Sequence, residues 1–555
     1  MEKTVESFRL NRIEWLFLGL VYFLGLFFRL WPRLLIDPHF LTMNADVWER
    51  LAMAQYFLDH GSLPQYCLRY LAYGHVPFWY PPLGPIVLGI LVKISSFDLP
   101  TVCSRIMPFI ETLTPLTLYF LSRWLFGRAA AYISTIVLAL TPSFIYWTGI
   151  TTPTSFTIFL MPAYILLLLI RNDRISSKIG RLNWIAVFAV ILAVNFMTHL
   201  TYFLALAMLL PIALLIFIKS AFQWKKILDF FAAVLISQLI TAFWWGPHNL
   251  YSWWIFKLAT SSGYKDPIAQ LQHYGIIAGG LGLIASFLYF WKILSEPRKC
   301  NRYDWLPLVW IIIPFIETQN EAILKLIHRL DLSWYTVYKP LEGYRFHCFL
   351  SQPLALMVGW VGAKFLIQKV KFKKLTCFIT VMVLSAVFCV DLIYISKTKL
   401  LFQNSGLNRQ EYQAMVWFRN NSTKNDRIIA DYYFSQMFAG VCGGRALLGG
   451  LFPLKNTNLP YITYPAVVQD DICTIYTTPD PKIARDLMLK YRCTAIYISP
   501  LLISSGNIGG GSCKGFGVKV NEEKFENREY FREVYNIDSV RIIKINADPL
   551  QGKTK

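Results

Sequence analysis

Charged residues are scarce in this sequence. They make up 16% of its 555 residues, against 55% hydrophobic residues, and the mean hydropathy is +0.43. In soluble proteins about a quarter of all residues are charged. This composition therefore excludes an ordinary soluble protein and predicts an α-helical polytopic membrane protein. The first apolar run, Trp15 to Leu35, is long enough to span a bilayer and is followed by no cleavage site, so we expect a transmembrane helix there and not a signal peptide.

Acidic residues are scarcer than basic ones: the sequence has 33 Asp and Glu and 54 Lys and Arg, which gives a net charge of +21. A basic surplus can indicate nucleic-acid binding. Here the basic residues are dispersed between apolar runs, where they can face anionic lipid headgroups and set the topology. We therefore expect the lipid bilayer as a partner, and no nucleic acid. CxxC pairs are also lacking, which argues against a zinc site.

The short run from Leu83 to Ile94 decides the topology. About 12 residues make a helix of about 18 Å, too short for a hydrocarbon core of about 30 Å. If the run does not cross, the later basic clusters share the side of the N-terminus, as the positive-inside rule requires. We therefore interpret it as juxtamembrane or re-entrant.

About eleven transmembrane helices follow from this topology, in a multi-pass protein of the cell membrane with a cytoplasmic N-terminus. After the first helix, we expect spans at Thr101 to Ser122, Ala129 to Trp147, Thr154 to Ile170, Leu182 to Phe196, Leu200 to Ile218, Ile227 to Trp245, Tyr274 to Trp291, Tyr303 to Glu317, Phe346 to Leu366 and Leu375 to Ile395.

The composition changes after the last of these helices. We expect residues 1–396 to form the transmembrane domain, including a first external loop at 36–100, and residues 397–555 to form an exterior soluble α/β domain. Strands are predicted at Arg427 to Ala430, Thr494 to Ser499 and Val540 to Ile545, and a helix at Lys482 to Lys490. Cysteines at 442, 473, 493 and 513 permit disulfides on this oxidising face without requiring them.

The polar and aromatic stretch from Asn44 to Pro82 lies in the first external loop. Asp46 and Glu49 form a capping-box pattern at a helix start, and Gly61 ends the predicted helix. One apolar face and the aromatic residues that follow are typical of a helix lying on a bilayer.

Charged and titratable residues in or beside the apolar runs have two readings each. Arg105 is most simply an anchor at the membrane surface, and Glu111 either bonds a polar group of a neighbouring helix or lines a cavity. His199 is more often a structural histidine than a catalyst. Arg345 either anchors its helix or forks onto a lipid phosphate. Glu317 and Glu321 are by default a solvated helix end.

Two strings in the loop, DVWERLAMAQYFLDHGSLP and FWYPPLGPIVLGIL, resemble the first external loop of GT-C superfamily membrane glycosyltransferases, particularly archaeal oligosaccharyltransferase catalytic subunits. LFGRAAAYISTIVLALTPSFIYWTGI is similar to the third helix of that family. Arg345 with Phe346 resembles a pair that opens a late helix, and RIIADYYFSQMFAGVCGGRALLGG lies where those enzymes carry an acceptor motif. The likeness covers most of the chain at the level of layout.

The resemblance implies an enzyme that takes a sugar from a polyprenyl-phosphate-linked donor, its co-substrate, at the outer membrane face, with Asp46 at the reaction centre. Asp46 would be the catalytic base and Arg345 would bind the donor phosphate. His75 and Tyr80 are candidate loop contacts. A divalent ion, Mg or Mn, held by Asp46 with Glu317 or Glu321, would be a variant of this site.

Two departures from the family concern the metal and the acceptor. The loop at 148–153 reads TGITTP, without the carboxylates the family carries there, and ADYYF at 430–434 replaces the motif Trp-Trp-Asp-Tyr-Gly. The resemblance therefore implies a sister activity on an unknown glycan or protein acceptor. A transporter or flippase of lipid-linked sugars, favoured by inverted repeats, and a non-catalytic membrane scaffold remain as alternatives.

Overall fold

The structure, a computed structural model, describes residues 10–35, 45–63, 81–149, 154–199, 201–217, 223–245, 276–297, 300–318, 347–367, 373–397, 409–423, 425–430, 432–442, 446–448, 465–505 and 520–546. The chain divides into two compact units. Unit 1 comprises Met1–Leu35 and Arg105–Gln403, and unit 2 comprises Ile36–Ser104 and Asn404–Lys555. The segment predicted as the first external loop thus packs with the C-terminal residues, and the domain boundary predicted at 396/397 stays a prediction.

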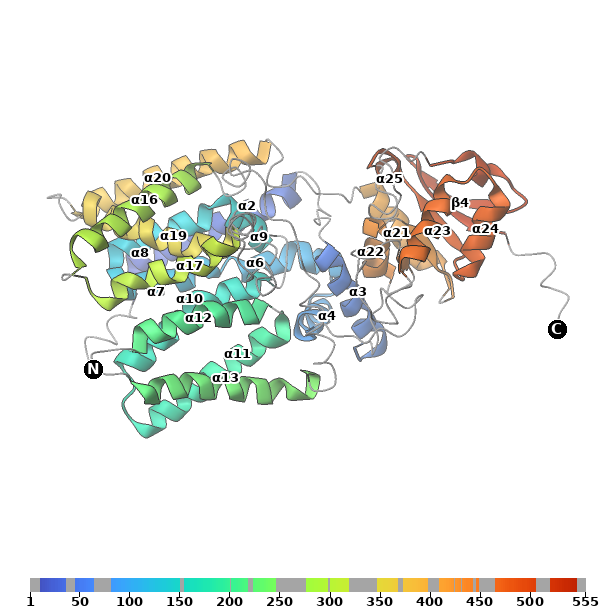
Figure 1. The fold of residues 1–555 in the computed structure, drawn as a ribbon. Helices are drawn as coiled ribbons and strands as arrows, with labels where there is room; N and C mark the ends of the chain where they lie inside the picture. Colours follow the sequence, from blue (N-terminus) through green and yellow to red (C-terminus); the bar gives the residue numbers. More distant parts are fainter. Residues whose placement is uncertain are drawn as a thin grey trace, which may run out of the picture. The chain divides into compact units, whose positions relative to one another are not determined.

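Unit 1 is helical in its described residues, and its long helices run side by side (Figure 1). They are α2 (Arg12–Leu35), α6 (Met107–Glu111), α7 (Thr114–Phe126), α8 (Arg128–Leu140), α9 (Pro142–Gly149), α10 (Thr154–Asp173), α11 (Lys178–Thr198), α12 (Thr201–Phe217), α13 (Trp224–Trp245), α16 (Ile276–Ser295), η4 (Arg302–Trp305), α17 (Leu306–Thr318), α19 (His347–Val361), η7 (Gly362–Ile367) and α20 (Lys373–Lys397).

Two predicted spans are each divided into shorter helices, and a proline lies at the start of a new helix in both. The span predicted at Thr101 to Ser122 is divided into η2 (Val102–Ile106), α6 and α7, with Pro115 in the first turn of α7. The span at Ala129 to Trp147 is divided into α8 and α9, which meet at a bend of 61° where Pro142 opens α9. Proline cannot donate to the preceding turn, so it favours a new helix start at such a break.

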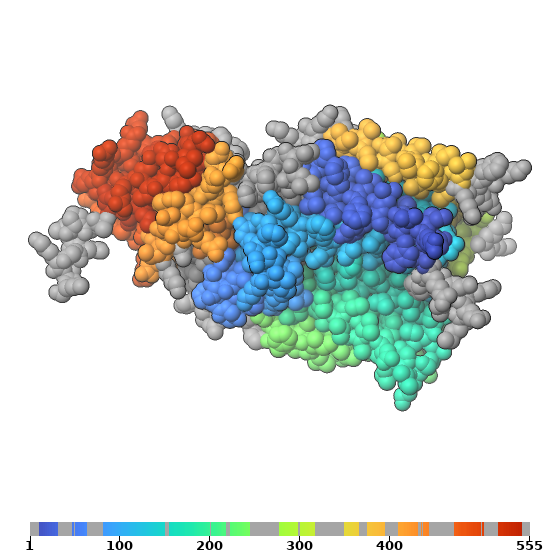
Figure 2. Space-filling view, turned by 180° about the vertical axis from the view of Figure 1, so that it is seen from behind, coloured from blue at the N-terminus to red at the C-terminus, as the bar shows by residue number. Residues whose placement is uncertain are grey.

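Six helices of the described residues are long and apolar enough to cross a membrane, or up to eight if each bent pair is one span. Large apolar side chains also face outward on these helices. On α2 they include Ile13, Leu16, Leu20 and Phe23, each more than 60% exposed, and Figure 2 shows this helix, in dark blue, on the surface of unit 1. Such faces are suited to lipid, so the chain is a multi-pass membrane protein; the number eleven stays a prediction.

One end of unit 1, which we name the basic end, gathers several of the predicted basic clusters. The buried Glu14 of α2 pairs there with Arg123 at 3.1 Å and with Arg128 at 3.2 Å. The guanidinium of Arg174, after α10, lies 4.8 Å from the centre of the Trp124 ring of α7. The N-terminal turn of α2 and the ends of α7 and α10 therefore meet at this end.

Unit 2 contains a five-stranded sheet in the order β2-β1-β3-β5-β4. The strands are β1 (Ile428–Ala430), β2 (Ala446–Leu448), β3 (Ala495–Ile498), β4 (Phe531–Ile537) and β5 (Val540–Ile545). β1 is parallel to β2 and β3, and β5 is antiparallel to β3 and β4. The described residues of β1 and β3 are all buried, as in a sheet covered on both faces, whereas in the edge strand β4 only Phe531 and Tyr535 are buried.

The helices of unit 2 are α3 (Ala45–His60), α4 (Leu83–Ser95), α5 (Leu99–Thr101), α21 (Arg409–Asn421), α22 (Tyr432–Cys442), α23 (Pro465–Thr477), α24 (Pro481–Lys490) and α25 (Pro500–Ser505). The three strands predicted from the sequence are confirmed as β1, β3 and β5, and the predicted helix as α24. Cys473 is disulfide-bonded, whereas Cys442 and Cys493 are buried thiols that form no disulfide.

Candidate functional site

The helix that carries Asp46 is α3, in unit 2. It begins at Ala45, so Asp46 is its second residue and lies inside the first turn, two positions past the capping position that the sequence predicted for it. Gly61 ends the helix as predicted, with a φ of +70° and its N–H bonded to the Phe57 carbonyl at 2.8 Å. The structure places Asp46 by its backbone, and its side chain is outside the description.

The apolar face of α3 is covered by protein. Val47, Trp48 and Leu51 are buried, and Ala52 packs against Ala439 of α22. A Cβ built on Gly440 would lie 3.1 Å from the Trp48 carbonyl oxygen and 3.2 Å from Leu51 Cβ. Small residues thus let α22 approach α3 closely. The interpretation of α3 as a helix lying on the bilayer is wrong for this face, because α22 occupies it.

The short apolar run predicted at Leu83 to Ile94 is α4, and it packs on the same helix. A Cβ on Gly89 would lie 2.7 Å from the Phe57 ring, and the Lys93 ammonium lies 5.5 Å from the centre of that ring. The chain leaves α4 through Asp98, which caps α5 by accepting the Thr101 N–H at 2.9 Å.

Asp98 also links this segment to α21. The Tyr412 hydroxyl donates to Asp98 Oδ2 at 2.6 Å. Burial, and then the hydrogen bond to Asp98, raises the pKa of Tyr412. The helix that carries Asp46 therefore packs between α4 and α22, and α21 is hydrogen-bonded to the segment that follows α4.

Unit 1 has its own buried polar contacts, at the start of α10 and of α12. Glu111 of α6 is buried and accepts a hydrogen bond from the Ser155 hydroxyl at 2.8 Å. Of the two readings of Glu111, the bond to a neighbouring helix is thus confirmed. His199 Nδ1 accepts the Thr201 N–H at 3.1 Å, as expected of a structural histidine, and the Arg105 side chain is exposed.

Sequence reasoning missed Arg29, which is 1% exposed in α2. Its Nε and Nη2 donate to Thr148 Oγ1 at 3.1 and 2.6 Å, and its Nη1 donates to the Gly25 carbonyl at 2.8 Å. The guanidinium also lies 5.4 Å from the centre of the Phe144 ring. The signal was available, because an arginine that interrupts an apolar run is a functional candidate by default.

The other predicted site residues are not brought together by the described structure. Glu317 lies near the end of α17, where only its backbone is placed. His75, Tyr80, Glu321 and Arg345 lie outside the described residues.

No group of three or more His, Cys, Asp or Glu within the described residues could hold a metal ion. Around Glu111 the described donors are one carboxylate and a hydroxyl, too few for the six or more oxygen ligands that Mg²⁺ or Ca²⁺ takes. These residues therefore do not fit a metal site, and Mg or Mn bound by Asp46 with Glu317 or Glu321 stays a prediction.

Comparison with solved structures shows what the fold resembles. The archaeal oligosaccharyltransferase AglB from Archaeoglobus fulgidus, in complex with an inhibitory peptide and a dolichol-phosphate, aligns over 97% of this chain and 75% of its own, with a TM-score of 0.60 and 12% identity. ArnT from Cupriavidus metallidurans, bound to undecaprenyl phosphate, aligns over 97% and 99%, with a TM-score of 0.57 and 12% identity. The fold is that of membrane glycosyltransferases.

The arabinofuranosyltransferase AftD from mycobacteria aligns over 98% of this chain and 40% of its own, with a TM-score of 0.58 and 10% identity. No family model and no curated protein matches the sequence. The resemblance to GT-C glycosyltransferases is thus confirmed at the level of the fold, and at these identities the likeness extends to the fold alone.

Proposed function

We propose that this protein is a GT-C-type glycosyltransferase that transfers a sugar from a polyprenyl-phosphate-linked donor to an acceptor at the outer membrane face. The observation that carries the proposal is the fold, which three glycosyltransferases share over nearly the whole chain. Two of them are described with a lipid phosphate, dolichol-phosphate in one case and undecaprenyl phosphate in the other. A polyprenyl phosphate as the carrier of the donor sugar fits this likeness.

In this proposal Asp46 is the catalytic base. Its carboxylate takes the proton of the acceptor, the acceptor atom forms a bond to the anomeric carbon, and the bond between that carbon and the phosphate oxygen breaks. The polyprenyl phosphate leaves as an anion and needs no protein acid. The burial of Trp48 and Leu51 against α22 supports this role, because it fixes the helix that carries Asp46.

The remaining residues act on the donor. Arg345 binds the donor phosphate through a guanidinium fork, which stabilises the charge that develops on the leaving group. His75 and Tyr80 contact the substrate from the loop. If a metal takes part, Asp46 with Glu317 or Glu321 would hold Mg or Mn, which would supply further positive charge at the phosphate.

The orientation in the membrane is part of the same proposal, with the N-terminus cytoplasmic and residues 397–555 exterior. Two observations support it. Basic residues from α7, α8 and α10 gather at the end of unit 1 where α2 starts, as expected for a cytoplasmic end. The disulfide of Cys473 in unit 2 fits an oxidising exterior.

The test is transfer itself. Membranes that contain the full chain are incubated with a radiolabelled polyprenyl-phosphate sugar, and the label is followed from the organic phase into water-soluble or protein-bound material. We expect label transfer above that of membranes without the protein. If a panel of polyprenyl-phosphate and polyprenyl-diphosphate sugars gives no transfer while the protein binds the donor, the glycosyltransferase proposal is wrong.

A further inference from the structure

A cavity of about 660 Å³ opens at the basic end of unit 1, between the end of α10 and the start of α13. Residues 171–176 line one side and residues 223–226 line the other. The volume lies within the range of about 300 to 1,000 Å³ that is typical of ligand sites.

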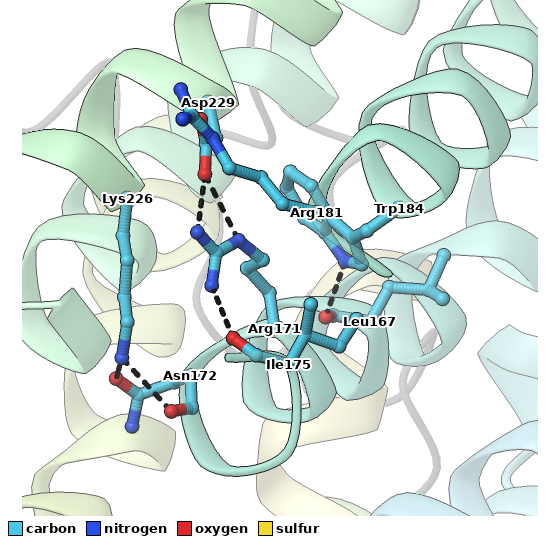
Figure 3. Close-up of polar contacts among 8 residues, drawn as sticks. All are labelled: Leu167, Arg171, Asn172, Ile175, Arg181, Trp184, Lys226 and Asp229. Carbon is cyan, nitrogen blue, oxygen red and sulfur yellow. Dashed lines mark hydrogen bonds and ion pairs between the residues drawn. The ribbon is translucent and has the colours of Figure 1, made fainter. Parts of the chain in front are cut away.

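The lining residue Arg171 is held from behind by one buried carboxylate, that of Asp229 in α13. Its Oδ2 accepts from Arg171 Nε at 3.0 Å, and Arg171 Nη2 donates to the same atom. Its Oδ1 accepts from Arg181 Nε at 2.6 Å (Figure 3). One negative charge thus faces two guanidinium groups, and the cluster keeps a net positive charge.

Asp173 is the one acidic residue among those described as lining the cavity, and its Oδ1 is engaged by protein. That atom accepts from Tyr303 Oη at 2.5 Å and from Asn172 Nδ2 at 2.7 Å. Lys226 Nζ in turn donates to both oxygens of Asn172, at 2.9 Å and 2.8 Å, as Figure 3 shows. The carboxylate is tied into the wall, and a lysine is held at the opening.

Two further cations lie at the cavity, Arg174 and Lys225. Both side chains are exposed, and within the described part of the chain neither makes an ion pair. The lining therefore carries Arg171, Arg174, Lys225 and Lys226 against Asp173. This charge balance favours an anion as the ligand.

Exposed apolar side chains lie on α13, whose first turn lines the cavity, and on α11, which packs against α13. Ile179 and Leu182 of α11 and Leu228 of α13 are each more than half exposed, and Trp224, in the lining itself, is 63% exposed. Tryptophan settles at the level of lipid headgroups, and exposed apolar side chains on membrane helices face acyl chains. The ligand should therefore combine an anionic headgroup with acyl chains.

We propose that this cavity binds the headgroup phosphate of an anionic membrane phospholipid. Arg174 and Lys225 contact the phosphate, Arg171 is a fixed cation in the wall because Asp229 holds it, and Trp224 marks the depth of the glycerol region. Basic pockets between transmembrane helices are suited to such headgroups. The site lies at the basic end and is independent of the proposed glycosyl transfer.

The test uses the detergent-solubilised full chain, titrated with dioctanoyl phosphatidylglycerol and read by native mass spectrometry. Dioctanoyl phosphatidylcholine, with the same acyl chains and no net charge, is the comparison lipid. The double variant Arg174→Gln with Lys225→Gln should weaken phosphatidylglycerol binding roughly 30-fold, because each surface cation contributes roughly a fivefold factor. Both residues are exposed, so the fold should survive.

Two matched double variants serve as controls. One removes two cations far from the cavity, and the other keeps both charges at the cavity while it exchanges the side chains. Lys482→Gln with Arg532→Gln removes two exposed cations from unit 2 and should leave binding unchanged. Arg174→Lys with Lys225→Arg keeps both charges and should retain wild-type affinity within a few-fold. Equal binding of the two lipids, wild-type affinity in the double glutamine variant, or displacement of the lipid by an equal concentration of inorganic phosphate would each overturn the proposal.

Discussion

Gly440 of α22 lies directly against Trp48 of α3: a Cβ built on this glycine would be 2.8 Å from Trp48 Cε3. Real Cβ atoms do not come so close to an aromatic ring, so only glycine allows the two helices this approach. The contact joins the helix that carries Asp46 to the C-terminal residues.

Gly440→Ala should therefore destabilise unit 2. Overpacking costs about 1 to 3 kcal/mol, against at most about 1 kcal/mol gained in helix propensity. The measurement is the thermal unfolding midpoint of the purified chain, together with sugar transfer. Gly280→Ala in α16 is the matched control, because nothing lies within 4 Å of a Cβ there. A Gly440→Ala protein as stable as the Gly280→Ala protein would mean that α3 and α22 separate easily.

Asp46→Asn should lower sugar transfer by a factor of about 10² to 10⁴, the contribution of general-base catalysis, while donor binding persists. Asparagine has nearly the same shape and no negative charge, so the fold should be kept. Asp59→Asn removes the same charge from the exposed far end of α3 and should leave transfer unchanged. Full activity of Asp46→Asn would leave Asp46 with a structural role alone.

Arg29 and Thr148 should be energetically coupled. Thr148→Val removes the hydroxyl that accepts two hydrogen bonds from the buried Arg29 guanidinium. Arg29→Met removes the guanidinium that donates them. A double-mutant cycle on the free energy of unfolding in mixed micelles should give a coupling of about 1 to 3 kcal/mol. Additive single effects would show that the two residues contribute independently.

Asp426 should make the stability of unit 2 depend on acid pH. Burial alone would raise its pKa, but hydrogen bonds from Thr494, the Thr423 N–H and Lys544 bring the pKa down to about 2. A carboxyl whose pKa is lowered on folding stabilises the protein above its unfolded pKa of about 3.9, and that stability is lost as the pH falls towards 2.

Pepsin digestion of the full chain between pH 2 and pH 5 measures this effect. Asp426→Asn should be cleaved faster than wild type at pH 5, by a margin of about 1 kcal/mol in the opening equilibrium, and the margin should vanish near pH 2. A constant difference across this pH range would assign the effect to packing and not to the charge.

Topology can be tested at Lys178, the exposed first residue of α11. Ser177 is less suitable because its hydroxyl caps that helix by accepting the Gly180 N–H at 3.0 Å. In intact cells, and in a chain whose native cysteines are replaced, Lys178→Cys should react with a membrane-impermeant maleimide only after permeabilisation. Lys482→Cys in unit 2, in the same background, should react without it. Labelling of Lys178→Cys from outside would reverse the proposed orientation.

The membrane class, most of the helices and three strands could be predicted from the sequence. These features are local, since a helix or strand is encoded by the period and length of its own apolar run. The run at Leu83 to Ile94 is an example: its apolar residues and its length predicted a short helix, and it is α4 in the structure.

Which elements pack against one another could be seen only in the tertiary structure. The apolar face of α3 could face a membrane or a protein. In the structure it packs against protein, because α22, which is far from α3 in the sequence, lies against it. In the same way, Arg29 is an unexplained charge in an apolar run until Thr148 meets it. The physical reason is that burial and hydrogen bonding depend on side chains distant in sequence, which no local pattern encodes.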